Sequence, residues 1–478
     1  MGLHAESGRA GAPVLDGPKL RILIYTDFKR FQRLFGTKKL QDTLERGALP
    51  ITTDFQVHDV DDPLTDQRLA NYDEIWLFLW KSDEARDPLS PAEIDALHRW
   101  MNGGGGVLIA GDHSTNEPVD TAQPEQVTYR GLGAAIGRRV PRARHLRRWN
   151  DRPSNEDMIA DTTEFSVGGW EASKVRLEED ALPQRLLLPV WAGDQPHPIF
   201  RDGRGSLLDR LPDHRHEGEV KLADDRPDLL APPINDEWPA TGHVATIIAR
   251  GINWRYGRTH DLMAQWDGHA VAAPGGAYGR ILADSSFHHY ADSNLRALAA
   301  DPNDSASWTK IQALYRNQAA WLAPPGIKAA YRRLAMDWLA ERPELPEAAS
   351  ADDEALGRVA FALLGSVLPG AWLHELVQDL ITTGGYGPVQ DSLPRGFDMV
   401  LLGTLARRLA ALSRPTPLQT PEFFPASFAQ ALQSPPTRDD PYPGLVEEAL
   451  LSYGTRLLAE QTRLEQLLGG VRPGPGPG

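Results

Sequence analysis

The fold of this chain is decided between residues 72 and 113, where YDEIWLFLW (72–80), LSPAEIDALHRWMNGGGG (89–106) and VLIAGDH (107–113) follow one another. The outer two segments are almost continuously apolar, which predicts strands buried on both faces. The middle segment predicts a helix, because Ser90 can cap it, Pro91 suits its first position and glycines end it. Strand, helix and strand in this order predict a parallel sheet with helices on both faces.

The same pattern extends over the first 300 residues. Further strands are predicted at 20–26 (LRILIYT), 54–60, 243–254 and 279–286. Residues 114–240 are rich in Pro, Asp and Arg with little periodicity, so we expect long functional loops with short elements there. These features predict one α/β domain over residues 20–300.

The rest of the chain is predicted to be helical. Five amphipathic segments after residue 305 indicate an all-α domain over residues 305–470. The Gly- and Pro-punctuated ends, 1–19 and 471–478, are predicted to be disordered.

Composition limits the possible functions. The chain has 478 residues, with 50 Lys and Arg against 65 Asp and Glu, a formal charge of −15 that argues against broad binding to nucleic acid or anionic lipid. It contains no cysteine, which excludes disulfides, thiolate ligands and cysteine nucleophiles. No long apolar run or signal peptide is present, so we expect a soluble cytoplasmic protein without membrane contact.

Acidic and imidazole groups follow three of the predicted strands. In an open parallel sheet, ligands bind beyond the carboxyl ends of the strands, so groups that are distant in sequence can converge there. A fourth cluster, LPDHRHEGEV (211–220), lies in the long loops. Imidazole and carboxylate suit zinc, manganese or iron. We therefore predict one divalent metal bound by residues from the set Asp112, His113, His214, His216, His288 and His289, with catalytic roles for Glu217, Glu219 and Asp284.

Structural explanations compete with these assignments. The adjacent histidines in LADSSFHHYAD (282–292) could be a hydrogen-bonding or packing pair, and Asp284 could cap the next turn. The segment 138–149 has six arginines in twelve residues. It could clamp an anionic substrate, with Asp27, Arg144, Arg147 and Arg148 as substrate-binding residues, or form salt bridges to acidic loops, the explanation that we favour.

The quoted strands, the helix at 89–106, HPIF (197–200) and GRILADSSFHHY (279–290) together resemble the class I glutamine amidotransferase-like fold, in its ThuA-like (trehalose-utilisation-like) branch. The resemblance covers about residues 20–300 and implies a flavodoxin-like, doubly wound sheet. Members with glutaminase activity carry a cysteine on the elbow after a central strand, where this chain has Gly111, Asp112 and His113. The resemblance therefore implies no glutaminase activity.

Two hypotheses of function follow. In the first, the chain is a metal-dependent hydrolase acting on a small anionic or carbohydrate-like substrate, with Glu217 or Glu219 as general base. In the second, it is a catalytically inactive binding or scaffold protein, whose helical domain recruits a protein partner and whose histidines form a buried hydrogen-bond network.

Overall fold

The computed structural model describes the chain in segments and divides it into two compact units. The described residues are 15–26, 29, 31–47, 49–59, 62–79, 89–111, 145–148, 183–192, 195–212, 218–221, 245–253, 258–270, 272–273, 276–300, 305–348, 350–381, 397–412, 449, 452, 462 and 463. The first unit is Met1–Tyr331 with Pro369–Trp372, and the second is Arg332–Leu368 with Leu373–Gly478. Their boundary falls inside two helices, α9 (Pro325–Ala340) and α12 (Gly370–Ile381).

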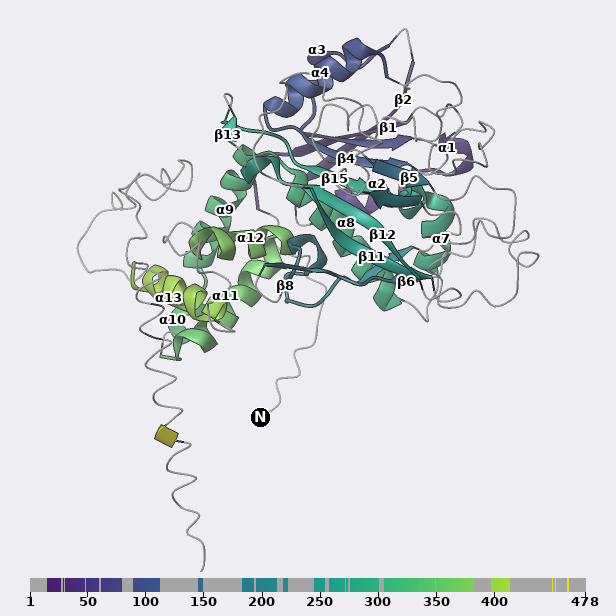
Figure 1. The fold of residues 1–478 in the computed structure, drawn as a ribbon. Coiled ribbons are helices and arrows are strands. Elements are labelled where there is room, and N and C mark those ends of the chain that lie inside the picture. Colours follow the sequence, from purple (N-terminus) through teal and green to yellow (C-terminus); the bar gives the residue numbers. More distant parts are fainter. Residues whose placement is uncertain are drawn as a thin grey trace, which may run out of the picture. The chain divides into compact units, whose positions relative to one another are not determined.

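A seven-stranded, mostly parallel sheet forms the centre of the first unit (Figure 1). Its parallel strands are β1 (Leu20–Thr26), β2 (Ile51–Val57), β3 (Glu74–Leu79), β4 (Gly106–Gly111) and β15 (Ile281–Asp284). Numbered along the chain, they stand in the order 2-1-3-4-5, the order of flavodoxin-like sheets. The structure thus confirms the mixed α/β architecture.

Two antiparallel strands extend the sheet beyond β15. They are β12 (Arg258–Trp266) and β11 (Thr246–Asn253), which occupies the edge. Strand β11 was predicted from its apolar run, whereas β12 was not predicted from the sequence. Its sequence, RTHDLMAQW, begins with four residues that give no strand signal, and its buried half is short.

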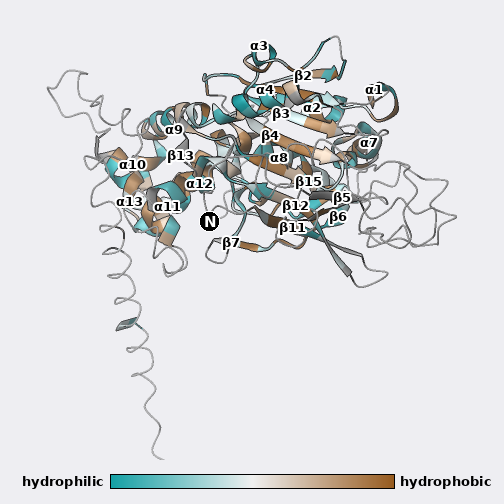
Figure 2. Cartoon of the chain, turned by 45° about the horizontal axis from the view of Figure 1, so that its top comes forward, coloured by the Kyte–Doolittle hydropathy of each residue, from teal (hydrophilic) through white to brown (hydrophobic). Residues whose placement is uncertain are grey.

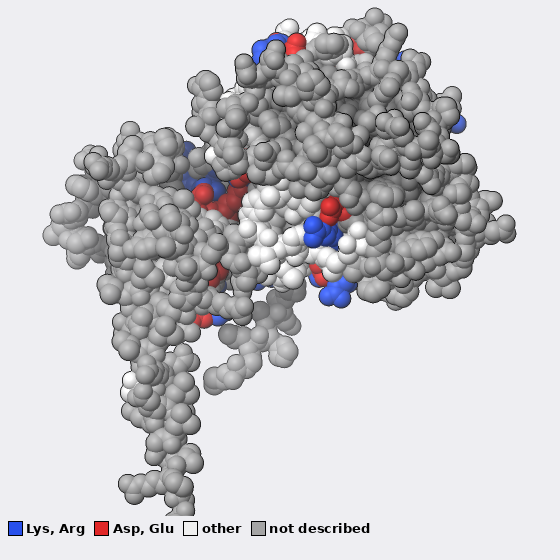
Figure 3. Space-filling model, viewed as in Figure 1, with Lys and Arg blue, Asp and Glu red and all other residues white. Residues whose placement is uncertain are grey.

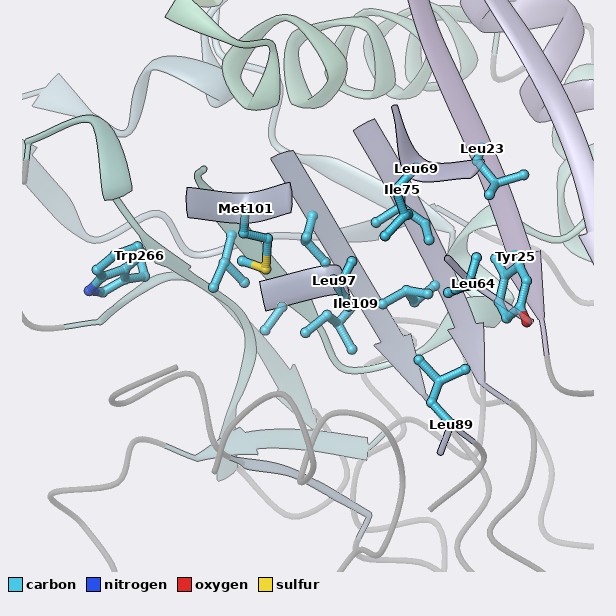
Figure 4. Close-up of a cluster of buried hydrophobic side chains, with 14 of the residues drawn as sticks. Leu23, Tyr25, Leu64, Leu69, Ile75, Leu89, Leu97, Met101, Ile109 and Trp266 are labelled. Carbon is cyan, nitrogen blue, oxygen red and sulfur yellow. The ribbon is translucent and has the colours of Figure 1, made fainter. Parts of the chain in front are cut away.

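Helices cover both faces of the sheet, as the unbroken apolar strands predict. On one face, α3 (Asp66–Leu69) and α4 (Pro91–Asn102) pack on alternate strand residues. Leu97 and Met101 of α4 belong to the same buried cluster as Leu23, Ile75 and Ile109 (Figure 4). The strands are accordingly hydrophobic along most of their length (Figure 2).

The opposite face is covered by α1 (Phe31–Leu34), α2 (Lys38–Glu45), α7 (Asp292–Ala300) and α8 (Ser305–Leu322). Its core is aromatic: the ring of Tyr290 lies 5.2 Å from that of Phe78, 5.8 Å from that of Trp76 and 5.2 Å from that of Tyr315 in α8. Sequence analysis placed α8 in the helical domain, and in the structure this helix belongs to the first unit.

Short elements occupy the described residues between β4 and β11. They are β5 (His145–Arg148), β6 (Pro183–Arg185), β7 (Val190–Ala192), β8 (Gln195–Pro196), η3 (Pro198–Phe200), β9 (Arg210–Pro212) and β10 (Gly218–Lys221). They pair as β5 with β10, β6 with β9 and β7 with β8. Before β15 come η6 (Gly268–Ala270), β13 (Ala272–Ala273) and β14 (Gly276–Ala277), and after it η7 (Phe287–Tyr290).

The described residues of the second unit are helical. Besides parts of α9 and α12, they form α10 (Glu344–Ala348), α11 (Asp353–Val367) and α13 (Phe397–Leu412). The last two pack closely through glycine: a Cβ on Gly357 would lie 1.7 Å from the Met399 carbonyl oxygen, and one on Gly403 would lie 1.6 Å from that of Asp353. Within the described part of the chain, no helix is long and apolar enough to cross a membrane.

Candidate functional site

The edge formed by the carboxyl ends of the parallel strands is the place where this class of sheet binds ligands, at the point where the strand order reverses. The reversal lies between β1 and β3. The strands end at Thr26, Val57, Leu79, Gly111 and Asp284. Every strand-end residue selected from the sequence comes at or after one of these positions.

Most of the predicted site residues lie outside the described part of the chain. These are Asp27, Asp112, His113, Arg144, His214, His216 and Glu217. Among the residues that are described, no three His, Asp or Glu side chains are grouped so that they could hold a metal ion. The predicted metal set is therefore represented by His288 and His289 alone, and the predicted catalytic set by the side chain of Asp284.

The described residues of the arginine-rich segment, His145–Arg148 (β5), pair antiparallel with Gly218–Lys221 (β10). Arg147 of β5 stands opposite Glu219 of β10, and Arg148 stands opposite Gly218. The choice between an anion clamp and salt bridges for the arginine-rich segment therefore stays a prediction.

Asp284 is the centre of a hydrogen-bond network that is completely buried. Its Oδ1 accepts from the backbone N–H of Ser286 at 3.0 Å and lies 2.6 Å from His289 Nδ1, while its Oδ2 accepts from the Tyr290 hydroxyl at 2.8 Å. Burial, followed by the charge of Asp284, raises the pKa of Tyr290 well above its ordinary value, so the phenol keeps its proton and donates. Gln318 of α8 donates in turn to the Tyr290 oxygen at 3.0 Å.

The second nitrogen of His289 faces Gln184 of β6. The amide Nε2 of Gln184 lies 3.0 Å from the carbonyl oxygen of Pro212 and 3.3 Å from His289 Nε2. Since the carbonyl can only accept, the Gln184 nitrogen is the donor to both atoms. His289 Nε2 must then carry a lone pair, and its proton lies on Nδ1, directed at Asp284.

His288 is packed among aromatic side chains. Its ring lies 4.3 Å from that of Phe287, nearly parallel to it, and 5.0 Å from that of Phe35, edge to face. Its backbone N–H donates to Ser286 Oγ, which caps the short helix η7. The two histidines thus have different surroundings, and only 1% of His288 is exposed.

The side chains of Val220 in β10 and of Asp284 pack on different faces of the sheet. Val220 of β10 belongs to the buried cluster on the α3–α4 face. Asp284 contacts Tyr290, which packs with Trp76 and Phe78 on the opposite face.

Sequence analysis missed a second acid–imidazole pair on this edge. His58 directly follows β2, and its Nε2 lies 3.3 Å from the carboxylate of Glu93 in α4. Burial would raise the pKa of Glu93, but hydrogen bonds from His58, from the backbone of Ser90 and from that of Leu64 outweigh it and lower the pKa to about 2. The only sequence signal was the S-x-x-E capping pattern of Ser90 and Glu93, which indicates a helix start and not a site.

Glu93 also decides what the start of α4 can bind. A helix N-terminus beside the reversal point is a common phosphate site in sheets of this order. Here the Ser90 backbone N–H donates to Glu93 at 2.8 Å, and Ser90 Oγ accepts from the Glu93 N–H at 3.3 Å. Because the protein's own carboxylate occupies this position, a ligand phosphate would be repelled from it.

Comparison with known proteins finds a distant likeness to solved structures. No family model matches the sequence, and no curated protein matches it. A crystal structure described as a ThuA-like protein from Bacteroides uniformis ATCC 8492 is 10% identical, with a TM-score of 0.27, and the match covers 64% of this chain and 92% of that one. A TM-score this low does not establish a shared fold, so the description of the sheet rests on its strand order.

Proposed function

We propose that this chain is a non-catalytic, small-molecule-binding protein built on a doubly wound, flavodoxin-like sheet of the class I glutamine amidotransferase-like, ThuA-like type. The observation that carries the proposal is the environment of His289. Both of its ring nitrogens already have partners inside the protein, Asp284 and Gln184, and its side chain is 0% exposed. A catalytic base or metal ligand must reach a substrate or an ion, whereas this arrangement is that of a buried structural network.

The ligand would bind where the strand order reverses, between the ends of β1 and β3. Asp27 and the arginine-rich segment (138–149) are the candidates for contact with this ligand. The all-α domain would recruit a protein partner. The protein itself would be located in the cytoplasm.

The proposal is tested by His289→Gln and Asp284→Asn, each of which leaves a buried hydrogen-bonding group without a partner. We expect each to lower the free energy of unfolding by about 1–3 kcal/mol, with the metal content of the purified protein unchanged. Thermal unfolding and elemental analysis measure the two quantities. Glu347→Gln, on an exposed helix position, is the control. Variants that keep the wild-type melting temperature while losing a metal would refute the structural role.

A metal-dependent hydrolase is the second candidate, favoured by the same histidine. A metal-binding imidazole commonly donates its other N–H to a carboxylate, as His289 donates to Asp284, and its lone pair on Nε2 is the atom that a metal takes. Gln184 would have to move aside. A divalent metal would activate water for hydrolysis, with His214 and His216 among its further ligands.

This candidate predicts near-stoichiometric zinc, manganese or iron in the wild-type protein. The double variant His214→Ala, His216→Ala should lose that metal and retain its fold, as judged by circular dichroism. Wild-type protein that contains no metal at full thermal stability would exclude the hydrolase.

A further inference from the structure

The two edges of the seven-stranded sheet are protected in different ways. At the β11 edge, Leu187 exchanges two backbone hydrogen bonds with Arg250, at 2.8 and 2.9 Å. At the β2 edge, no described residue makes a backbone hydrogen bond to the outer side of the strand. A row of unpaired N–H and C=O groups on an edge strand is a template for pairing with another chain. The β2 edge is therefore the one to examine for such pairing.

The backbone groups of β2 point alternately toward β1 and away from it. At the start of the strand, Leu20 donates its N–H to the carbonyl oxygen of Pro50 at 3.0 Å. At its end, His58 donates to the carbonyl oxygen of Thr26 at 2.7 Å. The even-numbered positions of β2 thus bond to β1, and the odd-numbered positions direct their N–H and C=O groups outward.

The composition of β2 favours pairing with a copy of itself. Its sequence, ITTDFQV, combines β-branched and aromatic residues with one charge and no proline. Segments of high β-propensity and low charge pair readily with identical segments when their edge is open. Every copy of this chain presents the same edge, so the partner that fits it is a second copy, joined about a two-fold axis.

One outward N–H of this edge is already occupied by a side chain. The backbone N–H of Thr53 donates to Oε1 of Glu45 at 3.2 Å, and the Thr53 hydroxyl donates to the same oxygen. Glu45 is the last residue of α2 and is exposed. Gln41, one turn earlier in α2, donates to the Thr53 hydroxyl oxygen at 3.1 Å. Glu45 thus caps the edge strand from the end of the neighbouring helix.

Two-fold pairing of β2 cannot avoid Thr53. Two copies that meet antiparallel exchange hydrogen bonds between their outward-facing, odd-numbered positions. An axis at position 53, 54 or 55 gives overlaps of 51–55, 51–57 or 53–57, and the Thr53 N–H is a donor in each of them. In the longest overlap, Asp54 would also face its own copy, and like charges directly opposite each other destabilise a strand pair.

We propose that the β2 edge is a self-association surface and that Glu45 is the guard residue that keeps it closed. Its carboxylate holds the N–H that a second copy would need, so pairing has to displace it first. Asp54 adds repulsion in the register of greatest overlap. The guard acts at the edge strand and is independent of the proposed function.

Glu45→Ala tests the guard. The substitution frees the Thr53 N–H in both copies, so we expect the Kd of self-association to fall by about tenfold or more relative to the wild type. Sedimentation velocity over a series of protein concentrations measures this change, and circular dichroism establishes that the variant is folded. Glu45→Gln keeps an acceptor oxygen and should associate no more than the wild type. A folded Glu45→Ala protein whose association equals that of the wild type, or Glu45→Gln that associates as strongly as Glu45→Ala, would overturn the proposal.

Two further variants establish where the copies meet. Gln41→Ala removes a contact with the Thr53 side chain but leaves the backbone cap, so its association should match that of the wild type. Because the chain has no cysteine, Thr52→Cys, at an exposed position of β2, carries a nitroxide label at a single site. In the Glu45→Ala background, the labels of two paired copies should lie within about 30 Å of each other. Stronger association of Gln41→Ala, or association of Glu45→Ala with the labels farther apart than this, would show that the β2 edges do not pair.

Discussion

The environment of each buried carboxylate in this protein determines its role. Asp284, Glu93 and Glu74 are all buried, yet the first accepts three hydrogen bonds, the second is kept ionised by its donors and the third has one donor. For Glu93 and Glu74, the balance between burial and the number of hydrogen-bond donors sets the direction in which the pKa moves. Residue type alone therefore says little about its role.

Glu93 gives a prediction with a defined pH range. Its pKa is lowered to about 2, so its hydrogen bonds stabilise the fold above the ordinary pKa of 4.5, and this stabilisation is lost as the pH falls from 4.5 toward 2. We expect Glu93→Gln to reduce the free energy of unfolding at pH 7 by about 2 kcal/mol and to have a much smaller effect near pH 2.

Urea denaturation of Glu93→Gln and the wild type at both pH values measures this difference. Glu45→Gln is the matched control, since Glu45 is exposed and bonds to Thr53 at the edge of the sheet. An equal loss of unfolding free energy at pH 7 and pH 2 would mean that Glu93 stabilises the fold through packing and not through its charge.

The sequence predicted the location of one polar cluster but not its contacts. The motif LADSSFHHYAD was correctly placed at the end of a sheet strand, because an apolar run followed by polar residues has that meaning in a parallel sheet. That Gln184 meets His289 and that Gln318 meets Tyr290 could not be predicted, because these partners come from β6 and α8 and no local pattern connects them.

Elements are held in place by residues from distant parts of the chain. The helix α2 has Thr37 at its N-cap, but this side chain makes no capping hydrogen bond. Instead Asp292, at the start of α7, accepts from the backbone N–H of Lys39 at 2.6 Å. Gly36 permits the close approach: its φ is +73°, and a Cβ there would lie 2.9 Å from Asp292 Oδ2.

We expect Asp292→Ala to destabilise the first unit by about 1 kcal/mol, the usual effect of losing a helix cap. Asp292→Asn keeps an acceptor oxygen and should recover most of this loss. Amide hydrogen exchange in residues 38–45 would locate the effect, since exchange should accelerate there first. Wild-type protection of this helix in Asp292→Ala would show that Asp292 does not cap it.

At the level of elements, the parallel strands and α4 were predictable because their apolar runs and caps are local signals. The paired short strands between β4 and β11 were not, since two to four residues carry too little periodicity. The position of α8 was also hidden, because an amphipathic helix packs equally well on a sheet or on other helices.

On the face in Figure 3, described basic side chains lie beside acidic ones, and no broad patch of one sign is visible among them.

The chain forms two separate cores, one around the sheet and one that includes α11 and α13. Two separate cores need not unfold in one transition. A substitution confined to one core therefore tests whether the two cores unfold together or separately.

Gly403→Ala provides such a substitution, since its Cβ would lie 1.6 Å from the Asp353 carbonyl oxygen. We expect it to destabilise the second unit by more than about 1 kcal/mol while the sheet unit melts as in the wild type. Gly326→Ala, with nothing within 4 Å of its Cβ, is the matched control. Calorimetry of both variants would distinguish this result from a single shifted transition, which would mean that the cores unfold together.

The late arrival of β15 has a consequence for synthesis on the ribosome. This strand is inserted between β4 and β12, so β4 gains its second neighbour only when residues Ile281–Asp284 have been made. At roughly 5–20 residues per second, the nascent β1–β4 sheet waits on the order of ten seconds with β4 as an open edge. During that interval β4 presents unpaired backbone groups that can pair with another nascent chain.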